Sequence, residues 1–223
     1  MTYLLNNGFH QISCGFQVNA EHILTSLEET SKILTILPST LYKSIDYKTT
    51  SSIIGAIFCH NLANATGTIV NPIEKGHPDL IPKSGENASE EQLRNYPYGI
   101  EIKCTIGNIK KGTNLRAGAI RINDLIGITW QAHHQEVRNL LGLIWDFVQE
   151  NGSFNYPKIT GVFYCDNLVD NDWGAISGTS GRNTKVTSLK ASGKLKMGQG
   201  WIALLNHPKY IDTYQKLLKF QVR

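Results

Sequence analysis

The feature that most constrains the fold is an alternating run that carries an acid and a lysine two positions apart. Apolar and polar residues alternate over residues 98–106, which predicts a half-buried β-strand. Side chains at positions i and i+2 of a strand point to the same face. Glu101 and Lys103 therefore emerge together, while Ile102 points to the opposite face.

A second acid precedes this strand by about twenty residues. Asp79 follows Pro78 and begins the short apolar run Leu80-Ile81. If that run lies beside the strand at 98–106, two carboxylates and one amine converge. Such a group can hold a hard divalent cation and set a positive charge beside a phosphate under attack. The simpler alternative is a surface strand with an exposed Glu and Lys, preceded by an Asp in a turn.

The residues Pro78-Asp79 and Glu101-Ile102-Lys103 resemble the catalytic motif of the PD-(D/E)XK nucleases, a superfamily that contains most type II restriction endonucleases. The resemblance implies an α/β (α+β) fold with a restriction-endonuclease-like αβββαβ core, in which helices flank a mixed central sheet. It covers about residues 48–166. We therefore expect one nuclease domain over 1–223, with a DNA-recognition and dimer-supporting region at about 167–223.

Hydrophobic periodicity predicts the elements around the motif. Apolar residues at helical spacing indicate helices at about 20–37, 49–62 and, with the strongest pattern, 131–150. Strand-like runs lie at 67–70, 80–81, 98–106 and 159–165. The order helix, strand, strand, strand, helix, strand is that of the family core. Weaker patterns follow, namely strands at 185–189 and 201–205 and a helix beginning at Pro208.

The resemblance also implies a role for each residue of the motif. Asp79 and Glu101 are expected to bind Mg²⁺, with Mn²⁺ able to substitute, and the backbone carbonyl of Ile102 is a further candidate ligand. Lys103 is expected to orient or deprotonate the attacking water. Because the helix at 49–62 contains no acid, the number of metals stays open, as does the participation of Glu74, Glu28 or Glu29.

Three histidines are further candidate site residues. His133 and His134 are adjacent in the predicted helix, where their side chains would point about 100° apart, so they cannot jointly bind one metal. We expect a structural or DNA-backbone role for them. His77 is either a turn residue beside Pro78 or a neighbour of the metal. Carboxylate ligation without a Cys or His cluster selects Mg²⁺ or Mn²⁺ over Zn²⁺.

Positive charge is concentrated in the second half of the chain. The net charge is +4, made up of −3 for residues 1–105 and +7 for residues 106–223. A basic half beside an acidic catalytic half suits a polyanionic substrate such as DNA. The expected DNA-binding residues are Lys110, Lys111, Arg116, Arg121, Arg182, Asn183, Lys185, Lys194 and Lys196. Of these, Arg182 and Asn183 are the favoured base readers, and the segment 108–121 is the competing recognition element.

The resemblance therefore predicts a type II restriction endonuclease that hydrolyses a specific site in double-stranded DNA and leaves 5′-phosphate and 3′-hydroxyl ends. It implies a homodimer and a cognate DNA methyltransferase as a genetic partner. A structure-specific repair or junction-resolving nuclease and a non-catalytic DNA-binding module are the alternatives. The sequence shows no membrane-spanning run and no signal peptide, and its four cysteines are scattered, so we expect a reduced, cytoplasmic protein.

Overall fold

The centre of the molecule is a five-stranded mixed β-sheet. The computed structural model describes residues 2–74, 76–107, 130–148, 156–176 and 185–218. The sheet order is β1 (Tyr3–Leu5), β11 (Trp201–Leu205), β9 (Tyr156–Cys165), β8 (Leu140–Val148) and β6 (Glu101–Ile106). Strands β6 and β8 are parallel, and the other neighbours are antiparallel. The chain is thus α+β with a mixed sheet, as expected, and β6 lies at one edge.

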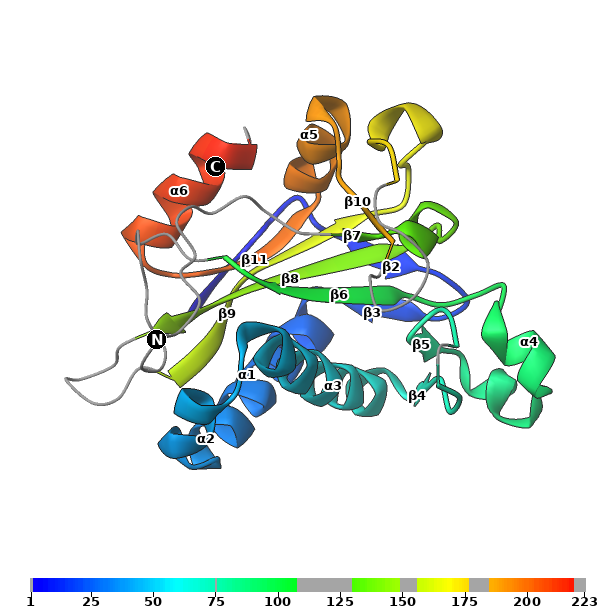
Figure 1. Ribbon diagram of the computed structural model, residues 1–223, viewed down its shortest axis with the longest axis horizontal. Helices are drawn as coiled ribbons and strands as arrows, with labels where there is room; N and C mark the ends of the chain where they lie inside the picture. Colours follow the sequence, from blue (N-terminus) through cyan, green and yellow to red (C-terminus); the bar gives the residue numbers. More distant parts are fainter. Residues whose placement is uncertain (1, 75, 108–129, 149–155, 177–184, 219–223) are drawn as a thin grey trace.

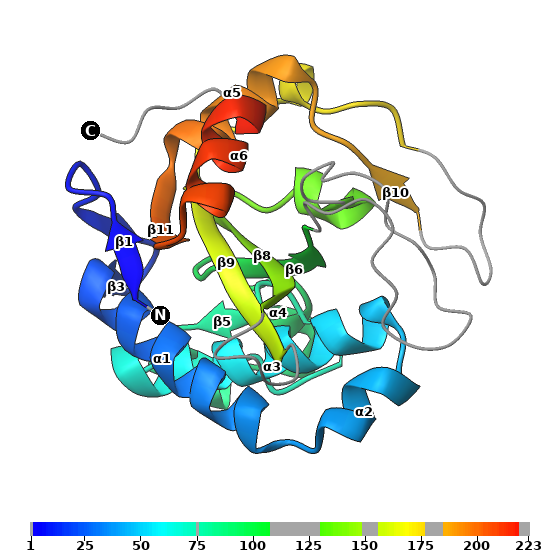
Figure 2. The same cartoon turned by 90° about the vertical axis from the view of Figure 1, so that its left-hand side faces the viewer.

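Helices cover both faces of this sheet (Figures 1 and 2). One face carries α1 (Ala20–Ile36), α2 (Ser39–Ser44) and α3 (Tyr47–Thr66). The other carries α5 (Ala191–Gln199) and α6 (Pro208–Leu218). Asn19 caps the N-terminus of α1 and Asp46 that of α3, since each of these side chains accepts a hydrogen bond from a backbone N–H of the first turn. The helices predicted at 20–37, at 49–62 and from Pro208 are confirmed. Among the described helices, none is long and apolar enough to cross a membrane.

The helix predicted over 131–150 is wrong. Residues Ala132–Gln135 form a short 3₁₀ helix, η2, and residues Leu140–Val148 form strand β8 in the middle of the sheet. Alternate side chains of β8 enter the two hydrophobic cores. Leu141 and Leu143 belong to the core shared with α1 and α3, and Leu140 and Ile144 to the core shared with α5 and α6. A strand buried on both faces is continuously apolar, and such a run also satisfies the i, i+3, i+4 spacing of a helix.

Short elements gather at the β6 end of the sheet and position the candidate site. Strand β4 (Ile69–Val70) pairs with β5 (Leu80–Ile81), as the runs at 67–70 and 80–81 predicted. Strand β7 (Trp130–Gln131) pairs with β10 (Val186–Thr187). The remaining elements are β2 (Gln11–Ser13), β3 (Gln17–Asn19), η1 (Lys83–Asn87), α4 (Glu90–Arg94) and η3 (Asp170–Asp172).

A partly buried ion pair ties α5 to the segment that follows β9. Lys196 donates a 2.6 Å hydrogen bond to Oδ2 of Asp172 and a 2.9 Å bond to the carbonyl of Asn167. The same Asp172 oxygen accepts from the backbone N–H of Val169 at 3.0 Å. Burial opposes ionisation of Asp172, but these donors outweigh it and lower the pKa of Asp172 to about 2.

Replacing Asp172 with asparagine should lower the free energy of unfolding by about 1–2 kcal/mol at pH 7, because Lys196 loses its charged partner. Since the pKa of Asp172 falls on folding, the stabilisation is present above about pH 4 and is lost as the pH drops towards 2. Urea unfolding at pH 7 and pH 2.5 measures both values. The exposed Asp170→Asn is the matched control, and an Asp172→Asn deficit of equal size at both pH values would contradict the assignment.

Candidate functional site

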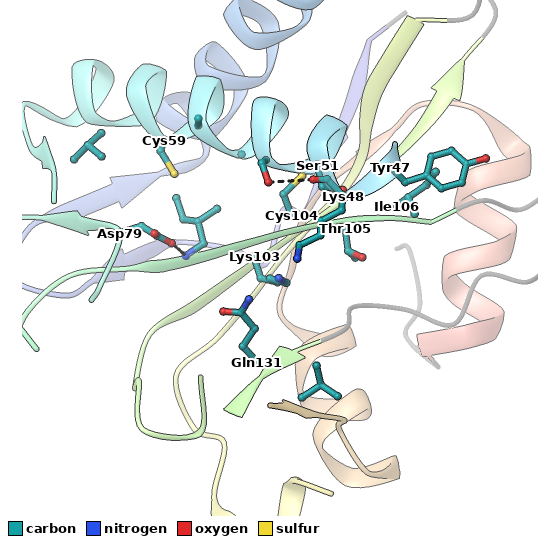
Figure 3. Close-up of a pocket in the computed structure, with 16 residues that line it drawn as sticks. Tyr47, Lys48, Ser51, Cys59, Asp79, Lys103, Cys104, Thr105, Ile106 and Gln131 are labelled. Carbon is teal, nitrogen blue, oxygen red and sulfur yellow. Dashed lines mark hydrogen bonds between the residues drawn. The ribbon is translucent and has the colours of Figure 1, made fainter. Parts of the chain in front are cut away.

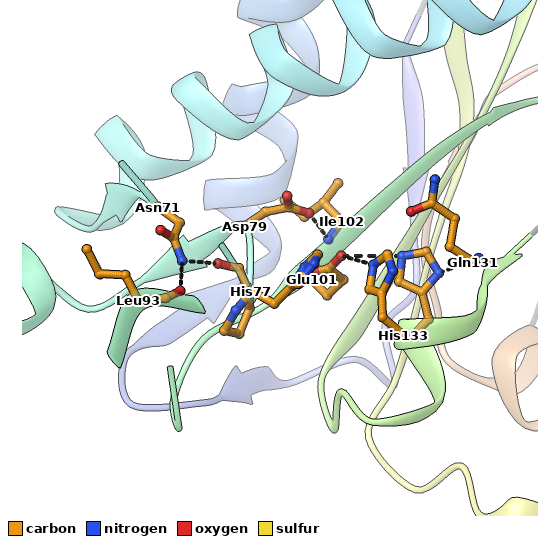
Figure 4. Close-up of polar contacts among 10 residues, drawn as sticks. Asn71, His77, Asp79, Leu93, Glu101, Ile102, Gln131 and His133 are labelled. Atoms are coloured by element: carbon orange, nitrogen blue, oxygen red, sulfur yellow. Dashed lines mark hydrogen bonds and ion pairs between the residues drawn. The ribbon is translucent and has the colours of Figure 1, made fainter. Parts of the chain in front are cut away.

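Asp79 lies beside the Glu-x-Lys strand, as the sequence predicted (Figure 4). Leu80 and Ile100 form an antiparallel bridge with two backbone hydrogen bonds, of 3.1 and 3.0 Å. This bridge brings the Asp79 carboxylate to the open edge of β6, where its Oδ2 accepts a 2.7 Å hydrogen bond from the N–H of Ile102. Asp79, Glu101 and Lys103 are therefore brought together, although their catalytic roles stay predictions.

A glycine permits this close approach. Gly99 has a φ of +140°, and a Cβ at this position would lie 2.1 Å from the carbonyl oxygen of Leu80. A residue with a side chain would thus combine a strained backbone with a severe clash. The segment before Asp79 is held by Asn71, whose amide donates to the carbonyls of Pro78 and Leu93 at 3.2 and 2.8 Å.

Glu101 is a buried carboxylate surrounded by three imidazoles (Figure 4). Only 3% of the residue is exposed. Its Oε2 lies 3.2 Å from Nδ1 of His77, and its Oε1 lies 3.1 Å from Nε2 of His133 and 3.3 Å from Nε2 of His134. The rings of His77 and His133 stack with centroids 4.1 Å apart. A buried carboxylate requires such donors, so the histidines stabilise its ionised form.

His133 and His134 lie in the 3₁₀ helix η2 and not in the predicted α-helix, and both reach the same oxygen of Glu101. That the two histidines do not jointly bind one metal stays a prediction. The expectation that no His cluster exists beside the motif is wrong, because His77, Glu101 and His133 form one. The structure places His77, a candidate neighbour of the metal, against Glu101. In the sequence, the histidine pair is indicated only indirectly, by the need of a buried carboxylate for hydrogen-bond donors.

The two carboxylates shift in opposite directions. Burial, reinforced by the negative charge of Glu101, raises the pKa of Asp79. Burial also acts to raise the pKa of Glu101, but hydrogen bonds from His133, His134 and His77 outweigh it and hold that pKa below its usual range. Burial lowers the pKa of the Lys103 ammonium. Opposed shifts of neighbouring titratable groups are typical of sites that handle protons or metals.

A groove of about 660 Å³ runs along the edge of β6 next to Asp79 (Figure 3). Lys103 lines it from β6, and Lys48, Ser51 and Ser52 line it from the first turns of α3. Further lining residues are Gln131 of β7 and Val186 of β10. The groove therefore joins the predicted catalytic lysine to a second lysine and to the C-terminal part of the chain.

Two donor sets could hold a cation here. Asp79, Glu101 and the carbonyl of Ile102 supply oxygen, as Mg²⁺ prefers. His77, Glu101 and His133 supply two nitrogens and an oxygen, all within 4.8 Å of one another. Glu101 belongs to both sets. Glu28 and Glu74 are exposed and Glu29 is bound to Lys32, so the described contacts link none of these three acids to either set.

The predicted DNA-binding residues are only partly described. Lys185 lies next to β10, close to the groove, and is exposed. Lys194 is exposed on α5, whereas the ammonium of Lys196 binds Asp172. The others lie outside the described residues: Lys110, Lys111, Arg116, Arg121, Arg182 and Asn183.

No family model, no curated protein and no solved structure matches this chain. The geometry of the site therefore carries the functional argument.

Gly99→Ala should destabilise the chain by at least about 2 kcal/mol more than Gly67→Ala. Both glycines have positive φ, but a Cβ at Gly67 meets nothing within 4 Å, whereas one at Gly99 meets the Leu80 carbonyl. Gly67→Ala thus isolates the backbone penalty of about 1 kcal/mol. Chemical denaturation of the two variants measures the difference. Equal losses would show that the Leu80–Ile100 approach contributes nothing to stability.

Proposed function

We propose that this protein is a Mg²⁺-dependent endonuclease of the type II restriction class, which hydrolyses phosphodiester bonds at a specific site in double-stranded DNA. One observation carries the proposal. Asp79 is bonded to the backbone of Ile102, between Glu101 and Lys103, at a groove that a second lysine also lines. Asp79 and Lys103 line the groove, and Glu101 adjoins them on β6. Two carboxylates and an ammonium are the groups that metal-assisted hydrolysis of a phosphodiester needs.

The residues at the edge of β6 fit a magnesium ion. Asp79 and Glu101 offer carboxylate oxygens, and the Ile102 carbonyl is a third hard oxygen donor on the same strand. Each carboxylate oxygen has two lone pairs. Oε2 of Glu101 contacts His77 through one lone pair, and its second lone pair can hold a cation. The histidines fix the orientation and the charge of Glu101 without exhausting its oxygens.

When bound, Mg²⁺ would polarise the scissile phosphate and lower the pKa of a coordinated water. Lys103 holds the water for in-line attack and offsets negative charge as it develops on the phosphate. Because burial lowers the pKa of Lys103, this amine exchanges a proton more readily than an exposed lysine does. Water adds to phosphorus and the bond to the 3′-oxygen breaks. The products are a 3′-hydroxyl and a 5′-phosphate.

The groove suits one strand of DNA. Lys48 lies near the N-terminus of α3, where the helix dipole adds positive potential, and its charge helps to lower the pKa of Lys103. Hydroxyls of Ser51 and Ser52 and the amide of Gln131 are present along the same path. Ammonium, hydroxyl and amide groups are the usual partners of a DNA phosphate backbone.

Two further features belong to the proposal. A homodimer would place two such sites on antiparallel strands and so match a palindromic target. A DNA methyltransferase that modifies the same target is the expected genetic partner. The pairing of β10 with β7 places residues 185–187 beside the groove, which supports the C-terminal region as the part that reads sequence.

Asp79→Asn, Glu101→Gln and Lys103→Ala should each reduce DNA cleavage at least about 100-fold, because each removes a metal ligand or a transition-state contact. Cleavage of a supercoiled plasmid in Mg²⁺ measures the rate, and circular dichroism checks that each variant folds. Glu91→Gln, on the exposed side of α4, is the matched control and should cut like the wild type. A folded Lys103→Ala protein with full activity would refute the assignment.

EDTA should abolish cleavage and added Mg²⁺ should restore it, whereas Ca²⁺ should support DNA binding without turnover. Gel shift and plasmid digestion on the same samples separate the two effects. Undiminished cutting in excess chelator is the opposing result.

The cleavage products test the kind of nuclease. Ends that share one sequence on a plasmid of known sequence support a restriction enzyme. Cutting confined to junctions or damaged sites would indicate a structure-specific enzyme, and DNA binding without cleavage a non-catalytic module.

A further inference from the structure

We propose that His77, Glu101 and His133 form a binding site for a borderline divalent transition metal such as Zn²⁺, which shares Glu101 with the oxygen-donor set at Asp79. Two imidazoles and one carboxylate form a donor set that suits zinc, nickel or iron far better than magnesium. Magnesium binds through oxygen ligands and keeps several of its waters. The inference does not depend on DNA or on cleavage.

The spacing of the donor atoms fits one ion. Ligands about 2.1 Å from a common metal, at tetrahedral or octahedral angles, lie roughly 3.0–3.4 Å from each other. Nδ1 of His77 lies 3.2 Å from Oε2 of Glu101, and Nε2 of His133 lies 3.1 Å from Oε1 of the same carboxylate. All three donor atoms lie within 4.8 Å, so modest rotation of the two stacked rings lets one ion contact all of them.

The three ligands come from three separate segments. His77 precedes β5, Glu101 begins β6 and His133 lies in η2 (Figure 4). About 26% of the His77 side chain and 30% of the His133 side chain are exposed, so an ion can reach them, whereas the Glu101 side chain is 4% exposed. The buried carboxylate therefore lies between two partly exposed imidazoles.

The role of His134 differs from that of His77 and His133. The backbone N–H of Gln131 donates a 2.8 Å bond to Nδ1 of His134, so this nitrogen carries no proton. The proton of the neutral ring is then on Nε2, which donates to Oε1 of Glu101. His134 is therefore a positioning residue that orients the carboxylate, as partners behind metal ligands do.

The test uses full-length protein without a histidine tag in metal-free buffer, titrated with ZnCl₂ and without DNA. Imidazole ¹⁵N resonances of His77 and His133 should shift and saturate at one equivalent, while those of the exposed His60 on α3 should stay in place. This readout requires no substitution, so it does not depend on a variant that folds. Calorimetry should then show that His77→Gln and His133→Gln each weaken zinc binding at least about tenfold, and that His60→Gln leaves it unchanged.

Two results would overturn the site: no shift of His77 and His133 at one equivalent of Zn²⁺, or wild-type affinity in folded His77→Gln and His133→Gln proteins. Failure here is distinguishable from failure of the proposed nuclease. Zinc binding without Mg²⁺-dependent cleavage rejects the nuclease alone. Mg²⁺-dependent cleavage by a protein whose His77 and His133 resonances do not shift with Zn²⁺ rejects the zinc site alone.

Discussion

The structure of the site depends on one buried negative charge. A carboxylate as covered as that of Glu101 is costly unless donors replace its hydration. Segments far apart in sequence meet to supply them: the loop before β5 brings His77, and η2 brings His133 and His134. Satisfying this one group therefore fixes the relative positions of the two segments and of the edge strand that carries Glu101.

Asp79 approaches the same strand from the segment just before β5. It caps the open edge of β6 through the N–H of Ile102, where a neighbouring strand would otherwise pair. Two carboxylates so close to each other cannot both ionise freely. The hydrogen-bond donors around each carboxylate determine which one stays charged. Glu101 has three imidazoles and stays charged, whereas burial raises the pKa of Asp79. The cation proposed for this site would balance the negative charge of the two carboxylates.

The hydrophobic pattern of the sequence predicts strand β6 correctly but not strand β8. Alternation over 98–106 predicted strand β6 and the shared face of Glu101 and Lys103, because period two has a single structural meaning. The continuous apolar run over 140–148 is compatible with a buried strand and with a helix. Its burial between α1 and α3 on one face and α5 and α6 on the other makes it a strand, although its spacing also suits a helix. That error concealed the convergence of His133 and His134 on Glu101, since the geometry of η2 was misjudged with it.

Local patterns in the sequence predict the half-buried strand with its acid and lysine and the helices α1 and α3. These features depend on neighbours along the chain. Which distant groups meet, including the approach of Gly99 to the Leu80 carbonyl, depends on the tertiary structure. The contact of Asp79 with Ile102, the groove beside Lys48 and the three imidazoles around Glu101 follow from strand pairing and burial, and these join residues whose separation in sequence carries no periodic signal.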